Sequence, residues 1–151
     1  MADRFPTELV GVRDGAVPRL RAEGVLQGGD LKSFRATVTL AASGNGLLTT
    51  ADALLLCQLP VGYRPVAYIV NGVALGASAQ IAIGTSKVHA SNGQYRASAI
   101  KNSTAYEIGL VPAAHAAAPV TVPTDIWLTV GTADLPTSGQ LIVEVVAAAA
   151  A

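Results

Sequence analysis

The chain has 151 residues, no formal net charge and a charged fraction of only 13%, against about 25% in a typical soluble domain. This length favours a single domain with a sizeable core, and the zero net charge argues against electrostatic binding to nucleic acid or to a membrane surface. No stretch reaches the roughly 18 apolar residues of a membrane-spanning helix, and the N-terminus lacks the apolar segment of a secretory signal peptide.

Residues 1–31 differ in composition from the rest of the chain. Eleven of the twenty charged side chains lie within the first 35 residues. Glycines and prolines interrupt any regular period in residues 1–31, and charges of both signs are interspersed with isolated apolar residues, namely Phe5, Leu9, Val10, Val17, Leu20, Val25 and Leu26. This pattern favours an extended N-terminal arm that lies along a partner, with a flexible tail as the alternative.

The arm also carries candidate contact residues, which are Arg4, Phe5, Arg13, Arg19 and Arg21. Its arginines could meet a phosphate backbone, but five acids lie among them and argue against such a target. We therefore expect the arm to contact protein.

The first predicted strands flank a loop at residues 60–65. Residues 32–42 alternate between apolar and polar side chains, which predicts a strand with one solvated face. Residues 53–59 are nearly all apolar, so we expect a strand buried on both faces, with Cys57 as a small core residue. Pro60 ends this strand, Gly62 supplies backbone freedom for the turn, and residues 65–70 form the returning strand of a hairpin.

Five further strands are predicted between turn signals, over residues 80–83, 94–101, 104–111, 125–130 and 140–146. In residues 104–111, the apolar side chains Tyr106, Ile108 and Leu110 share one face and Glu107 lies on the other. In residues 140–146, Leu141, Val143 and Val145 share the face opposite Glu144. Prolines bracket residues 113–118 too closely for a helix. About eight short antiparallel strands with local connections predict an all-β domain over residues 32–151, a jelly-roll-like β-sandwich.

No residue pattern in the chain indicates a chemical reaction. His89 and His115 lie in predicted loops without metal-ligand spacing, and no nucleophile or phosphate-binding motif is present. The acids beyond residue 35 form no recognisable catalytic pair; they are Asp52, Glu107, Asp125, Asp134 and Glu144. We therefore expect no enzymatic activity, no metal, no cofactor and no small-molecule substrate.

Tyr63 and Arg64 form a candidate contact pair at the tip of the loop. Tyr63 is expected to be the most exposed aromatic side chain, and tyrosine and arginine are common anchors of protein interfaces. Tyr68, Tyr106 and Trp127 fit strand positions, where we expect them to pack.

Three stretches carry a resemblance to a known family. They are residues 59–65 (LPVGYRP) followed by an apolar strand, residues 76–86 (GASAQIAIGTS), and the closing pair 125–130 (DIWLTV) and 138–145 (SGQLIVEV). Over about residues 34–146 the chain resembles small virion proteins of tailed bacteriophages, of the capsid decoration (cement) type. No catalytic residue comes with these stretches.

The resemblance implies a structural protein on the capsid surface of the virion, made in the host cytoplasm. It implies a homo-oligomer, usually a trimer, that binds the major capsid protein and neighbouring copies of itself and so stabilises the head. An arm would add contacts at high effective concentration. The alternatives are a head-fibre, tail or receptor-binding jelly-roll protein of a phage virion, or a carbohydrate-binding module that uses Trp127 or Tyr63.

Overall fold

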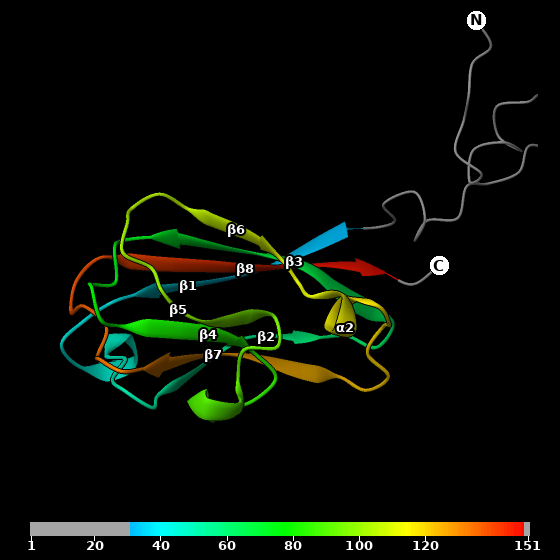
Figure 1. Ribbon diagram of the computed structural model, residues 1–151, viewed down its shortest axis with the longest axis horizontal. Coiled ribbons are helices and arrows are strands. Elements are labelled where there is room, and N and C mark those ends of the chain that lie inside the picture. The colour runs from blue at the N-terminus through cyan, green and yellow to red at the C-terminus, as the bar shows by residue number, and fades with distance from the viewer. Residues whose placement is uncertain (1–30, 150–151) are drawn as a thin grey trace, which may run out of the picture.

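The computed structural model describes residues 31–149, which form two four-stranded antiparallel sheets (Figure 1). In spatial order, sheet A contains β1 (Leu31–Thr39), β8 (Gln140–Ala149), β3 (Tyr63–Gly72) and β6 (Glu107–Leu110). Sheet B contains β2 (Ala53–Leu59), β7 (Thr124–Gly131), β4 (Gln80–Gly84) and β5 (Arg96–Ile100). Eight strands in this order are those of a jelly roll, so the predicted all-β sandwich is confirmed.

The helical content of the described part is limited to single turns, η2 (Gly44–Gly46), η3 (His89–Ser91) and α2 (Ala113–Ala116). The turn α2 lies between Pro112 and Pro119, a stretch that we predicted to be too short for a helix; it holds one turn of four residues. No helix within residues 31–149 is long and apolar enough to cross a membrane.

The core lies between the two sheets and follows the period-two alternation of the strands. In β8, Leu141, Val143 and Val145 point inward and are at most 1% exposed, as their spacing predicted. Ile126 and Leu128 of β7 meet them from sheet B and are fully buried. Burying side chains of this size contributes roughly 1.5–3 kcal/mol each, so these central strands hold the sandwich together.

Strand β8 runs further than its predicted end at residue 146. It continues through the alanine stretch to Ala149, because β8 lies between β1 and β3 and pairs with both. Ala147 and Ala148 are buried there. The small side chains suit a strand that is covered on both edges.

The predicted hairpin at residues 53–70 is wrong. β2 belongs to sheet B and β3 belongs to sheet A, so residues 60–62 cross between sheets instead of turning back along one sheet. β2 is moreover an edge strand, with Leu55 46% exposed. The expectation that this strand is buried on both faces is therefore also wrong, since only its inward side, with Leu56 and Leu59, lies in the core.

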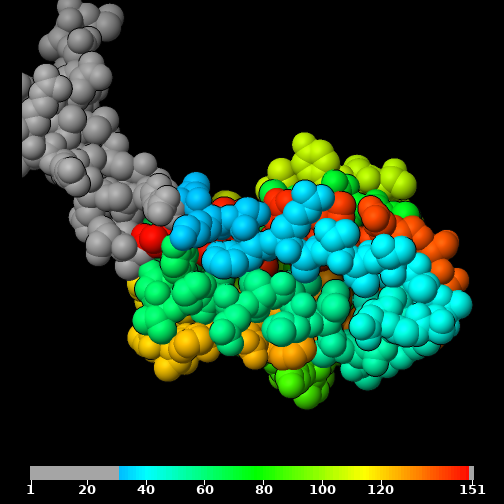
Figure 2. Space-filling view, turned by 180° about the vertical axis from the view of Figure 1, so that it is seen from behind, coloured from blue at the N-terminus to red at the C-terminus, as the bar shows by residue number. Residues whose placement is uncertain are grey.

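The two open sides of the sandwich are closed in different ways. On one side, β1 and β2 lie next to each other, and Figure 2 shows the blue atoms of β1 along the blue-green atoms of β2. On the other side, the edge strands β5 and β6 are connected by an ion pair between Arg96 and Glu107. On this side, an ion pair thus links the edge strands of the two sheets.

Candidate partner-binding surface

Strand β6 turns its apolar side to solvent. Tyr106, Ile108 and Leu110 share one side of the chain, as predicted, but this side lies on the outer face of sheet A, where they are 62%, 61% and 80% exposed. Glu107 points toward the interior instead and pairs with Arg96. The expectation that Tyr106 packs against the core is therefore wrong. An edge strand with an exposed apolar side is typical of a surface that another segment covers.

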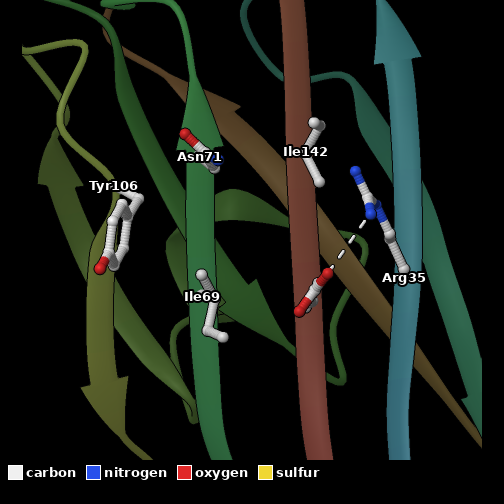
Figure 3. A pocket seen from close by; sticks show the side chains of 6 residues that line it. Arg35, Ile69, Asn71, Tyr106 and Ile142 are labelled. Carbon is white, nitrogen blue, oxygen red and sulfur yellow. Dashed lines mark ion pairs between the residues drawn. The ribbon is translucent and has the colours of Figure 1, made fainter.

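A shallow depression adjoins this exposed side of β6. Its volume is about 250 Å³ and its walls come from all four strands of sheet A or their ends (Figure 3), through Arg35, Ile69, Asn71, Tyr106, Ile142 and Glu144. At its β1 side, Arg35 Nε lies 3.8 Å from Glu144 Oε1, and Ser33 Oγ donates to Glu144 Oε2 at 3.2 Å. The depression therefore has a mixed lining, in which Ile69, Ile142 and Tyr106 lie beside Asn71 and a partly exposed ion pair.

Of the two ion pairs found within residues 31–149, the one between Arg96 and Glu107 contains the more buried cation. Arg96 is 3% exposed, and its Nε and Nη2 donate to the two Glu107 carboxylate oxygens at 2.7 and 3.0 Å. Its Nη1 donates to the carbonyls of Ile81 and Ala99. The hydrogen bond from Arg96 holds the pKa of the Glu107 carboxyl below its usual value, although burial acts in the opposite direction. Every polar group of this pair is used, so its role is structural.

Sequence reasoning missed this pair. It predicted only a strand over residues 94–101 and assigned no role to Arg96, which is buried beside Tyr95 at the start of β5. The one hint of such a pair in the sequence was the small number of basic residues. Beyond residue 35 the chain has only four basic residues, and two of them, Arg64 and Arg96, directly follow a tyrosine, so the sequence alone did not single out Arg96.

Tyr63 and Arg64, predicted at a loop tip, are the first two residues of β3 because the connecting loop is only residues 60–62. The Tyr63 ring meets Phe34 edge-on with centroids 6.1 Å apart, and the Lys32 ammonium lies 5.4 Å from the Tyr63 centroid. Tyr63 is therefore half-buried, and among residues 31–149 Tyr106 is the most exposed aromatic side chain.

Arg64 differs from the other described arginines. Arg35 and Arg96 each pair with a glutamate, whereas within residues 31–149 the buried Nε of Arg64 has no hydrogen-bond partner. Arg64 stands opposite Ala148 in the pairing of β3 with β8. A desolvated guanidinium nitrogen without an acceptor costs free energy, which a carboxylate from another segment would recover. Its contact role, like that of Tyr63, stays a prediction.

The remaining aromatic and titratable candidates are engaged in local structure. Lys87 Nζ lies 4.5 Å from the centroid of the Trp127 ring, so a cation lies over one face of this ring. His89 bridges the outer face of sheet B, with its ring nitrogens 3.1 Å from Thr129 Oγ1 and 2.9 Å from Ser98 Oγ. His115 is exposed on α2.

The single cysteine has the properties of a packing residue. Cys57 is partly buried against the core, and burial, with the Asp125 charge as a smaller cause, raises the pKa of its thiol to about 11. The thiolate, which is the reactive form, is therefore rare at neutral pH. Within residues 31–149, no three His, Cys, Asp or Glu side chains are grouped as metal ligands.

The predicted contact residues of the arm lie outside the described residues. These are Arg4, Phe5, Arg13, Arg19 and Arg21. The assignment of residues 1–31 as an arm accordingly stays a prediction.

Known structures share this fold, although no protein-family model and no curated protein matches the sequence. A chain of the capsid asymmetric unit of cyanophage Pam1 aligns with a TM-score of 0.52 at 21% identity, over 78% of this chain and 84% of that chain. A chain of the capsid of Ralstonia phage GP4 aligns with a TM-score of 0.60 at 12% identity, over 82% of this chain and 87% of that chain. At these identities the likeness shows a common fold, and these two chains come from phage capsid structures.

Proposed function

We propose that this protein is a structural component of a phage virion, a capsid decoration protein that binds the outer capsid lattice and stabilises the head. The observation that carries the proposal is the likeness to capsid chains of two phages, which covers 84% and 87% of those chains. The likeness thus extends over nearly the whole of each neighbour, as expected if the sandwich itself is the capsid component. The proposal includes no catalytic activity and no cofactor.

The surface of the sandwich supports a role in assembly. Beyond residue 35 only nine charged side chains are present, and Arg96 and Lys101 are buried among them. Outward-facing apolar residues concentrate on β6, beside a depression on the outer face of sheet A. A surface that is poor in charge and exposes a row of apolar side chains is suited to contact with other protein chains.

The proposed partners are the major capsid protein and neighbouring copies of the chain, in a homo-oligomer that we propose to be a trimer. Repeated weak contacts across a lattice add up, because each attached contact raises the effective concentration of the next. Modest contacts by Tyr63, Arg64 and the arm would then suffice for stable attachment.

The number of copies in each virion tests this proposal. We expect quantitative mass spectrometry of purified virions to find this chain at a stoichiometry comparable with that of the major capsid protein. A small fraction of that number would support a tail, head-fibre or receptor-binding part and overturn the decoration role. Absence from purified virions would overturn both.

The arm's contribution can be measured on the full chain. Replacing Arg4, Arg13, Arg19 and Arg21 by glutamine should reduce the amount bound to isolated heads, while leaving the circular dichroism spectrum of the sandwich unchanged. The matched control is Lys87→Gln, which removes an exposed cation near Trp127 on the outer side of sheet B. Equal binding by the arm variant and the control would refute a role of the arm arginines.

A further inference from the structure

We propose that the outer face of sheet A is the docking site for the N-terminal segment, residues 1–30, of the same chain. The site consists of the exposed side chains Tyr106, Ile108 and Leu110, together with the depression beside them. Docking of the segment is independent of the virion assignment; only its consequence for lattice binding rests on the proposed function.

Both the segment and the outer face of sheet A carry apolar side chains that could pack against each other. Residues 1–30 contain well-separated apolar side chains, among them Phe5, Leu20 and Leu26. The outer face of sheet A exposes Ile108 and Leu110 by 61% and 80%. Contact between the two sets of side chains would remove apolar surface of both from water, which is favourable.

The connection of the segment to the fold places it within reach. Residue 30 leads directly into Leu31, the first residue of β1 in sheet A. With strands about 4.8 Å apart, the distance across this sheet from β1 to β6 is roughly 15 Å, whereas 30 extended residues reach about 100 Å. Gly28 and Gly29 allow the chain to reverse direction just before β1.

Coverage by the chain's own segment is favoured over coverage by the same face of a second copy. From strand spacing and rise, the outer face of sheet A measures roughly 500 Å², below the approximately 800 Å² per partner of a stable interface. A tethered segment needs less area, because the tether supplies a high effective concentration.

Charge also favours the segment. Leu31, Ala148 and Arg64 stand side by side across β1, β8 and β3, so the unsatisfied Nε of Arg64 lies near the point where the segment joins the sheet. Glu23 and Asp30 are the acids of the segment closest in sequence to this point. A carboxylate from either one provides the acceptor that Arg64 lacks within the described residues.

A docked segment would also orient the arginines of the arm. Arg19 and Arg21 flank Leu20, and in an extended chain alternate side chains point in opposite directions. If Leu20 is among the docked apolar residues, both guanidinium groups would face away from the sandwich. If the protein decorates a capsid, this layer of arginines is what the lattice meets.

Photo-crosslinking of the full chain tests the proposal. p-Benzoylphenylalanine is introduced in place of Ile108 or, in a second variant, Leu110, and the purified protein is irradiated as an equal mixture of ¹⁴N- and ¹⁵N-labelled copies. The control carries the same group in place of Val88, which is 62% exposed, closely matching Ile108, but follows β4 in sheet B. Thermal unfolding of each variant verifies that the fold is retained.

Positions 108 and 110 should crosslink to tryptic peptides from residues 1–32. The yield should be at least about tenfold higher than from position 88, because the tether gives the segment a high effective concentration. These crosslinks should join peptides of the same isotope. Crosslinks that join different isotopes, or that reach strands of a second copy, would assign the face to a neighbouring molecule and overturn the proposal. A yield from positions 108 and 110 no higher than from position 88 would overturn it as well.

Discussion

Replacing Glu107 by alanine tests whether charge closes the sandwich between β5 and β6. The substitution leaves the Arg96 guanidinium, 3% exposed, without its counter-ion. Breaking a fully buried pair costs roughly 3–5 kcal/mol. The Glu107 side chain is 33% exposed and Arg96 keeps its hydrogen bonds to backbone carbonyls, so we expect a smaller loss of about 2–3 kcal/mol.

Thermal unfolding followed by circular dichroism measures this loss. For a domain of this size, each kcal/mol lowers Tm by about 2–4 °C, so Glu107→Ala should lower Tm by roughly 4–12 °C. The matched control is Glu144→Ala, which breaks the more exposed pair with Arg35 and should cost at most about 1 kcal/mol. Equal losses in the two variants would refute the idea that the pair between Arg96 and Glu107 joins the sheets.

The pH dependence of the same variant provides a second check. The hydrogen bond from Arg96 holds the folded pKa of Glu107 below its ordinary value of 4.5, outweighing burial. A carboxyl whose pKa is lower in the folded state stabilises the fold fully above its unfolded pKa. This stabilisation is lost as the pH falls through the folded pKa, so the gap in stability between wild type and Glu107→Ala should narrow below about pH 4.5.

Three further substitutions or measurements follow from particular contacts. Gly72→Ala should lower the free energy of unfolding by about 3 kcal/mol, because the backbone has φ +112° and a Cβ there would collide with the Gln140 carbonyl. The control Gly62→Ala, with φ +90° and open space around it, should cost only about 1–2 kcal/mol. Equal losses in the two variants would contradict the close contact at Gly72. Cys57 in the folded protein should react with a disulfide reagent at pH 8 at least about tenfold more slowly than in the unfolded chain, because its pKa is raised to about 11; the thiolate fraction falls about 100-fold, and the higher nucleophilicity of the more basic thiolate offsets part of that. Equal rates would show that the thiol is accessible and unperturbed. Lys87→Ala should change the fluorescence of Trp127, whose ring the ammonium faces at 4.5 Å, and should cost less than about 1 kcal/mol; an unchanged spectrum would mean that the two side chains do not meet in solution.

The sequence predicted most strands because alternation is a local signal. The spacing of Leu141, Val143 and Val145 placed one face of β8 in the core, and the structure confirms it. Local spacing does not say which strand pairs with which. The segment around residues 60–62 has the composition of a hairpin turn, yet it crosses between sheets, because strand pairing in a jelly roll depends on residues distant in sequence.

The same limit explains what was missed in the candidate surface. The alternation of Tyr106, Ile108 and Leu110 was predicted, but its direction was not. Apolar side chains normally face the core, whereas here the position on the inner side belongs to Glu107, which Arg96 draws inward across the gap between the sheets. An ion pair between edge strands of two different sheets does not change the apolar–polar alternation of either strand, so the sequence pattern does not reveal it.

A cryo-electron microscopy reconstruction of the virion head that contains this protein would show where the sandwich lies on the particle. We expect jelly-roll density on the outer side of the capsid shell at regularly repeated lattice positions, with the outer face of sheet A and its covering segment directed toward the shell. Density confined to the tail or to a single vertex would contradict the decoration role. Density on the lattice in which Tyr106, Ile108 and Leu110 face bare solvent would contradict the assignment of this face as the contact surface.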